Sequence, residues 1–250
     1  MVGSLLLRGM LVGVVAGLLA FGFARVFGEP QVDRAIAFEE QLSQATGKAQ
    51  EHEPELVSRK TQAGLGLFIG VVVYGAAIGG LFALVFAFVY GRVGRIGPRG
   101  TAALLALVGF VALVLVPGLK YPANPPSVGS FETIGVRTQL FFAMLAISVV
   151  AMVLAAALAR RLAEHYGVWN GALLAGAVFI AIIAVAYHAL PGINEVPQQF
   201  SATLLWQFRL ASLGIHVVFW TALGLLFGAL TERSLAERRG GWLAKRPASR

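Results

Sequence analysis

The sequence predicts an all-α integral membrane protein with about six transmembrane helices, and three observations lead to this fold class. Of its 250 residues, 58% are hydrophobic and only 13% are charged, whereas about a quarter of the residues in a soluble domain are charged. The hydrophobic residues form several uncharged runs of roughly 20 residues, the length that crosses a bilayer as a helix. These runs do not alternate in polarity as barrel strands do, so we expect helices to satisfy the backbone in lipid.

The six predicted spans follow these runs and cover residues 5–27, 63–90, 101–119, 137–158, 168–190 and 206–230. The first has a short uncharged core, which Arg8 and Arg25 extend because long basic side chains can reach the interface from a helix end. A cleaved signal peptide is the alternative for this segment, but no clear A-x-A cleavage site is evident. The spans together form a single membrane domain, residues 1–232.

The only sizeable segment between spans is a predicted outer loop, about residues 28–62. Its stretch AIAFEEQLSQATGKAQEHE is rich in Ala, Glu and Gln, which favours a short amphipathic helix. We expect this helix to rest on the membrane face or on a partner. After the last span, residues 233–250 form a predicted basic cytoplasmic tail.

Basic residues determine the predicted orientation, because they gather in the tail and in two of the segments between spans, at Arg92, Arg95, Arg99, Arg160 and Arg161. The positive-inside rule places these segments and both termini in the cytoplasm. The acidic loop 28–62 then lies outside. We predict no nucleic-acid partner despite the net charge of +8, because the bases punctuate apolar runs.

Glycines at four-residue spacing occur in several spans, at Gly9, Gly13 and Gly17, at Gly66 and Gly70, at Gly75 and Gly79, and at Gly224 and Gly228. Such spacing lets helix backbones approach closely. Incidental glycine is also common in membrane helices, so the pattern does not identify a function.

Two loops and their flanking spans resemble each other. Span three ends LVPGLKYPANPPSVGS and span five ends ALPGINEVPQQF, so Pro117 corresponds to Pro191, and each loop leads to a basic residue, Arg137 or Arg209. Helix ends favour Pro and Gly in any case, but this does not explain the basic residues. With a weaker third copy, SRKTQAGLGLF beside GVRTQLFF, the pattern predicts three repeated helical hairpins. We expect the two loops to lie together, with a site at the repeat interface.

His188, Glu195 and His216 are the candidate metal ligands. The first two lie at the outer end of span five, and His216 lies about ten residues into span six, near mid-membrane. Ionisable residues at that depth are functional candidates, although a histidine bonded to a neighbouring helix is the structural alternative. Imidazole and carboxylate suit Co, Ni or Zn. Arg209 would repel a cation, so we expect it to pair with Glu195 or Glu132.

The sequence lacks the motifs of common pumps and hydrolases. It contains no cysteine, Walker loop, H-E-x-x-H, G-x-S-x-G or dinucleotide fingerprint, each of which carries a specific chemistry. We therefore predict that the protein is not an enzyme and holds no permanently bound cofactor.

Several segments resemble the CbtA family of probable cobalt transporter subunits. They are LLLRGMLVGVVAGLLAFGFARVFGEPQVDRAIAFEE, YPANPP, GVRTQLFF, LPGINEVP and the span around His216, and the resemblance covers about residues 1–230. It implies a bacterial inner-membrane protein linked to cobalamin biosynthesis, with cobalt ion as substrate. It also implies a small single-span, histidine-rich partner, CbtB. Family members are usually described with five spans, one fewer than hydropathy predicts here.

Two functions remain open at this point. The chain is expected to be the membrane subunit of a cobalt or divalent transition-metal uptake system, or else a non-transporting membrane scaffold or assembly subunit. The small set of candidate ligands fits both functions, because the partner could present the metal.

Overall fold

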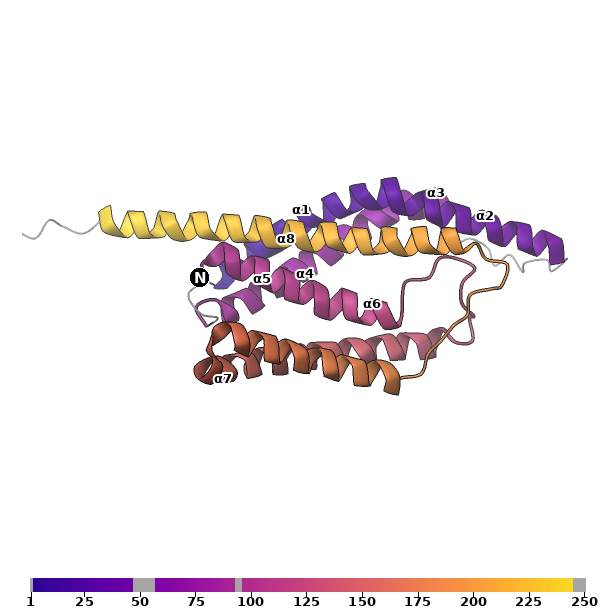
Figure 1. Ribbon diagram of the computed structural model, residues 1–250. Helices are drawn as coiled ribbons and strands as arrows, with labels where there is room; N and C mark the ends of the chain where they lie inside the picture. Colours follow the sequence, from indigo (N-terminus) through magenta and orange to yellow (C-terminus); the bar gives the residue numbers. More distant parts are fainter. Residues whose placement is uncertain (1, 47–56, 93–95, 245–250) are drawn as a thin grey trace, which may run out of the picture. The chain divides into compact units, whose positions relative to one another are not determined.

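The regular elements of the computed structural model, which describes residues 2–46, 57–92 and 96–244, are all helices (Figure 1). They are α1 (Val2–Phe23), α2 (Glu29–Thr46), α3 (Arg59–Thr61), α4 (Leu67–Val89), α5 (Pro98–Phe110), α6 (Val116–Lys120), α7 (Ile134–Ala189) and α8 (Ala202–Ala244), with π-helical turns at Ala24–Gly28, Gln62–Gly66 and Val111–Leu115. The predicted all-α class is confirmed. Some features that the sequence predicts lie outside the described residues. They are part of the acidic loop, the end of the basic tail, and the bases Arg95, Lys245, Arg246 and Arg250.

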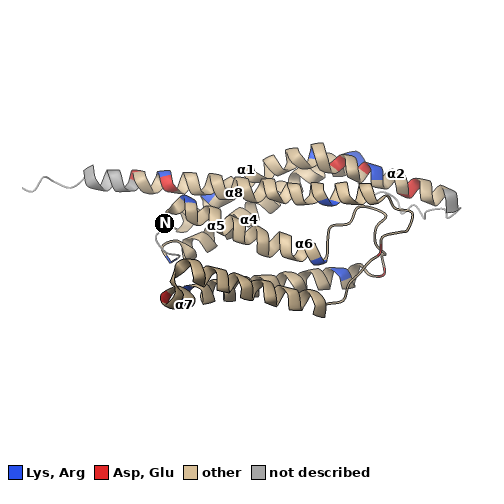
Figure 2. Cartoon of the chain, in the orientation of Figure 1, with Lys and Arg blue, Asp and Glu red and all other residues tan. Residues whose placement is uncertain are grey.

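Five helical segments in the described part of the chain are long and apolar enough to cross a membrane. The fourth, α7, contains the non-helical residue Gly167, with φ 79° and ψ 161°, and there it folds back on itself as two arms (Figure 1). Each arm exceeds the roughly 20 residues that a crossing requires, so these segments provide six crossings. Charged residues lie along α2 and mostly near the ends of the other helices, with long uncharged stretches between them (Figure 2).

The turn between the two arms is tighter than predicted. The sequence pattern placed a short loop after residue 158, but the first arm continues through Tyr166 and only Gly167 leaves the helix. A Cβ on Gly171 would lie 2.8 Å from the backbone nitrogen of Ala163, so the arms are in backbone contact beside the turn. His165 Nδ1 lies 3.3 Å from Arg161 O, as expected for a histidine at a helix end.

The described chain comprises two compact units. Unit 1 contains Met1–Val26, Pro54–Leu107 and Gly214–Arg250, and unit 2 contains Phe27–Glu53 and Val108–Leu213. The units divide α5 and α8, so each of these helices contributes to both.

In unit 1, α1 and α4 pack through their glycines. A Cβ on Gly13 would lie 2.0 Å from Gly75 O, and a Cβ on Gly79 would lie 2.1 Å from Gly9 O. Both distances are too short for any side chain, so the backbones touch, as small-xxx-small spacing allows. By contrast, Gly70 of the same helix α4 has no atom within 4 Å of its would-be Cβ, so only part of the glycine pattern serves packing.

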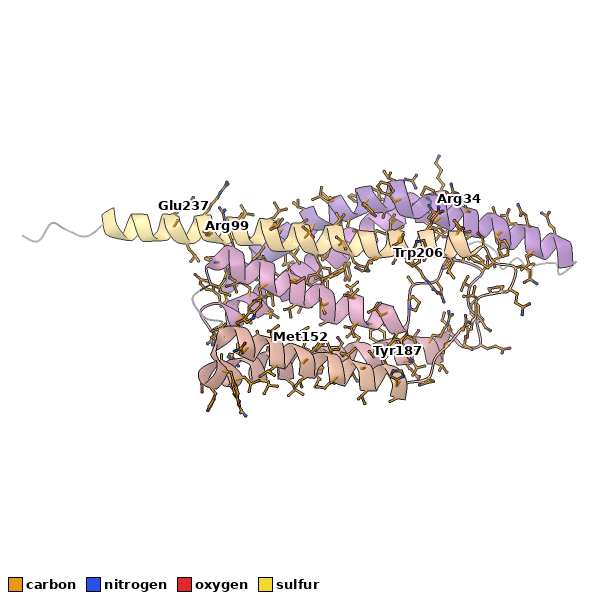
Figure 3. All side chains as sticks on the ribbon, viewed as in Figure 1. Arg34, Arg99, Met152, Tyr187, Trp206 and Glu237 are labelled. Carbon is orange, nitrogen blue, oxygen red and sulfur yellow. The ribbon has the colours of Figure 1, made fainter. Side chains whose placement is uncertain are left out.

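The second part of α8 forms the centre of unit 1. Leu223 and Phe227 are fully buried, and the Phe227 ring contacts the rings of Phe82 and Phe86 on α4. A Cβ on Gly224 would lie 2.6 Å from Ala106 Cβ on α5. Arg8 of α1 donates to Thr231, and Arg99 of α5, labelled in Figure 3, pairs with Glu232. These contacts show that α8 is antiparallel to α1 and α5 and parallel to α4, as alternating membrane crossings require.

In unit 2, the C-terminal part of the third span packs against both arms of α7. Val116, Met144 and Ala186 are the buried residues of this cluster, with partly buried apolar neighbours around them. Pro117 is the second residue of α6, which directly follows the π-turn Val111–Leu115. A proline inside a helix removes one N–H and crowds the preceding turn, and the wider π-turn accommodates that disturbance.

Candidate functional site

The two loops that resemble each other meet in unit 2, and we call segments 121–133 and 190–201 together the loop junction. Lys120 Nζ donates to Tyr187 O at 2.7 Å, and Tyr121 Oη donates to Pro191 O at 2.8 Å. Tyr187 lies near the loop end of the second arm of α7 (Figure 3). The prediction that the loops after Pro117 and Pro191 lie together is therefore confirmed.

Glu195 is held by the other loop and by the helix that follows that loop. Its Oε2 accepts a hydrogen bond from Ser130 N at 2.9 Å and lies 3.6 Å from Arg137 Nε. The Thr133 hydroxyl, the Ser130 N–H and the positive charge of Arg137 hold the pKa of Glu195 below its usual value. This carboxylate is therefore ionised at neutral pH and already engaged with donors of the chain itself.

Gly129 makes the space in which the Arg137 guanidinium lies. A Cβ at this position would be 2.2 Å from Arg137 Nη1, and the φ of Gly129 is +119°, a conformation that only glycine adopts readily. Arg137 Nη2 also lies 3.4 Å from Ser130 O. The turn at Gly129–Ser130 thus positions both the arginine and the N–H that binds Glu195.

Arg209 binds neutral oxygens rather than a carboxylate. Its Nη2 donates to Asn124 Oδ1 at 3.0 Å and its Nε donates to Ala123 O at 3.4 Å. The prediction that Arg209 pairs with Glu195 or Glu132 is therefore wrong. The physical reason is that Arg137 and Ser130 occupy the Glu195 carboxylate, while the turn in YPANPP presents an amide and a carbonyl to Arg209.

Helix α2 packs on the loop junction through its apolar face. Ala35 is buried against Val128 of one loop and Phe200 of the other, and the rings of Phe38 and Phe200 lie 5.1 Å apart edge to face. Ser127 Oγ donates to Ala35 O at 3.2 Å. We expected this helix to rest on the membrane face or on a partner. Ala35 and Phe38 pack on the chain's own loops, and contact of this helix with the membrane face or a partner stays a prediction.

A polar contact joins the exposed side of α2 to the beginning of α8. Arg34 Nη1 donates to Gln207 Oε1 at 3.3 Å, and Figure 3 labels Arg34 and also Trp206, which precedes Gln207. Segments from three parts of the chain therefore converge on the loop junction.

The three predicted metal ligands differ in their surroundings. His188 is exposed at the end of α7, with its ring beside that of Tyr187. Glu195 is bound as described above, and His216 is half-buried on α8 in unit 1. Within the described residues, no group of three or more His, Cys, Asp or Glu side chains gathers to hold a metal ion. Their role as ligands remains a prediction.

Sequence reasoning missed the residues that organise the loop junction. Ser130 contributes its backbone N–H, Thr133 a hydroxyl and Gly129 an absent side chain. The sequence does not distinguish these residues beyond the turn-rich composition of PPSVGS, since Ser and Gly are common in any loop. Asn124 likewise has no distinguishing signal within YPANPP, and its contact with Arg209 emerges only from the fold.

Comparison with known proteins gives one match. A family model described as "Probable cobalt transporter subunit (CbtA)" matches residues 2–232. No curated protein and no solved structure matches the chain.

Proposed function

Because the chain belongs to the CbtA family of probable cobalt transporter subunits, we propose that it is the membrane subunit of an uptake system for cobalt or a similar divalent transition metal, linked to cobalamin biosynthesis. The observation that carries this proposal is the family match over residues 2–232, which includes nearly all of the five helical segments long enough to cross a membrane. On this proposal the chain is not an enzyme.

The proposed location is the bacterial inner membrane, with both termini in the cytoplasm. The support is the charge pattern, since the bases of residues 91–100 and of the tail belong inside by the positive-inside rule. In this orientation the loop junction and α2 face the outside, where an ion arrives. The lipid bilayer surrounds the exposed apolar side chains of the spans.

We propose that cobalt is a passing substrate rather than a resident cofactor, with His188, Glu195 and His216 as its transient ligands. Exposed His188 is accessible to an arriving ion. Glu195 would first have to exchange the Ser130 N–H and Arg137 for the metal. His216 lies deeper along the sixth span, where an ionisable side chain is costly and is usually retained for function.

A subunit implies a partner, and we propose a small single-span protein with a histidine-rich end, like CbtB. The support is chemical, because imidazole suits cobalt and this chain offers few clustered ligands among its described residues. Ligands from a partner would complete a coordination shell that the chain alone begins.

A non-transporting scaffold or assembly subunit is the second candidate function. The observation that favours it is the engagement of Glu195 by Ser130, Thr133 and Arg137. A carboxylate that is already held by donors of the fold is a poor entry ligand, and it would serve the same structural purpose if no ion ever passed.

Uptake of radiolabelled cobalt by cells distinguishes the two functions. We expect cells that express the chain with its partner to accumulate cobalt faster than cells that express the partner alone, because only the chain supplies several crossings. Equal uptake, with the chain present at normal abundance in the membrane, would support the scaffold function.

Two single substitutions test the proposed path. We expect His216→Ala and Glu195→Gln each to reduce cobalt uptake by about tenfold or more, the scale on which a lost metal-site contact acts. Membrane abundance is measured first, and Arg160→Gln on the first arm of α7 is the matched control, because Arg160 is exposed and far along the chain from the proposed ligands. Normal uptake in both variants would remove these residues from the path.

A further inference from the structure

The two arginines that open the repeated spans exchange partners across the loop junction. Arg137 follows loop 121–133, yet its Nε lies 3.6 Å from Glu195 of the other loop. Arg209 follows loop 190–201, yet it donates to Asn124 of the first loop at 3.0 Å. Each loop is therefore fastened to the helix that follows the other loop.

We propose that Arg137 and Arg209 are positioning residues that clasp the two loops into one closed cap, and that the loops must separate for an ion to pass. The clasp consists of the Arg137–Glu195 and Arg209–Asn124 contacts. The second half of this proposal rests on the transport role proposed above, whereas the closed cap itself does not. The repeat accounts for the exchange in part, since the two arginines occupy equivalent positions and each reaches the opposite loop, whereas their partners Glu195 and Asn124 are not equivalent.

The two halves of the clasp differ in strength. The Arg137 and Glu195 side chains are only 26% and 17% exposed, so water and salt screen their attraction less than they would at an open surface. Arg209 meets a neutral amide and a neutral carbonyl, so its contacts lack the attraction between two opposite charges. Loss of Arg137 should therefore open the cap more than loss of Arg209.

Val128 reports whether the cap is closed. It immediately precedes the Gly129–Ser130 turn, is 6% exposed, and packs under α2 against Ala35 and Phe200. Separation of the loops would uncover it, whereas motion confined to the membrane-spanning part would not. The chain has no cysteine, so a single Val128→Cys substitution gives one reactive thiol at this position.

The test measures the labelling rate of the cysteine at position 128 in membranes with an impermeant maleimide, without any metal. Relative to the otherwise unchanged chain, we expect Arg137→Gln to accelerate labelling by roughly tenfold or more, since the partly buried ion pair with Glu195 no longer holds the closed form. Arg209→Gln should accelerate it less. Arg137→Lys, which keeps the positive charge, should recover part of the protection, and Arg160→Gln on the same helix should change nothing.

A second reporter separates opening of the cap from unfolding. Ser148 is fully buried in the first arm of α7, so the cysteine of a Ser148→Cys chain should stay unreactive in every variant. Unchanged labelling at position 128 in both arginine variants would overturn the clasp, and so would equal acceleration at both positions, because the arginines would then merely hold the fold together. Cobalt uptake by the unsubstituted chain tests the transport function separately, so failure of one idea does not conceal failure of the other.

Discussion

Gly79→Ala should destabilise the protein severely, because it places a methyl group where the backbones of α1 and α4 touch. The new Cβ would lie 2.1 Å from Gly9 O and 2.9 Å from the Cα of Gly13. Neither is the flexible end of a side chain, so the two helices would have to move apart. Overpacking of this kind costs about 1–3 kcal/mol, and more where the backbone cannot yield. We expect lower membrane abundance and a lower Tm of the purified protein in detergent.

The same helix α4 provides the control for this prediction. Gly70 is exposed, and a Cβ there would have no atom within 4 Å. Gly70→Ala should therefore leave the Tm unchanged or raise it, since alanine favours a helix over glycine by up to about 1 kcal/mol. If both variants had the same Tm, the glycine contact between α1 and α4 would not stabilise the protein as argued.

Gly167→Ala should disturb the hairpin of α7 through the backbone alone. No atom lies within 4 Å of its would-be Cβ, so space is not limiting. The strain comes from φ 79° and ψ 161°, a region that is essentially restricted to glycine and costs other residues about 1–3 kcal/mol. We expect a lower Tm and faster cleavage by a protease beside the turn at this residue, because the two arms separate more easily.

Gly176 in the second arm is the matched control for the hairpin. It has a helical conformation and open space around its would-be Cβ, so Gly176→Ala should be neutral or stabilising. A Gly167→Ala protein with unchanged Tm and unchanged cleavage would show that the arms are held together by their packing, without a contribution from the turn conformation.

The fold class and the number of crossings could be predicted because the tendency of a segment to cross a membrane depends on the composition of that segment alone. Runs of apolar residues must become helices when no water is available for the backbone, and this holds whichever neighbours they acquire. The interruption between the fourth and fifth spans was also predictable, although its form was not. The predicted loop after residue 158 proved to be helix, and only Gly167 leaves the helical conformation.

The candidate site was predictable only in outline. The paired Pro-Gly motifs and the arginines that follow them predicted that the two loops would meet, and they do so through Lys120 and Tyr121. The repeat indicated that Arg137 and Arg209 are equivalent, but it could not show that each contacts the opposite loop. The metal-ligand role of His188, Glu195 and His216 remains a prediction.

The sequence by itself thus determined which segments of this protein lie in lipid and which residues are scarce enough to be functional candidates. Only the tertiary structure decided that Glu195 binds Ser130 and Arg137, that Arg209 binds Asn124, and that α2 covers Val128. The physical reason is that burial in lipid is a property of a segment, whereas a hydrogen bond or an ion pair depends on two groups from distant parts of the chain meeting within about 3–4 Å. That meeting is fixed by the packing of the helices, which no single segment encodes.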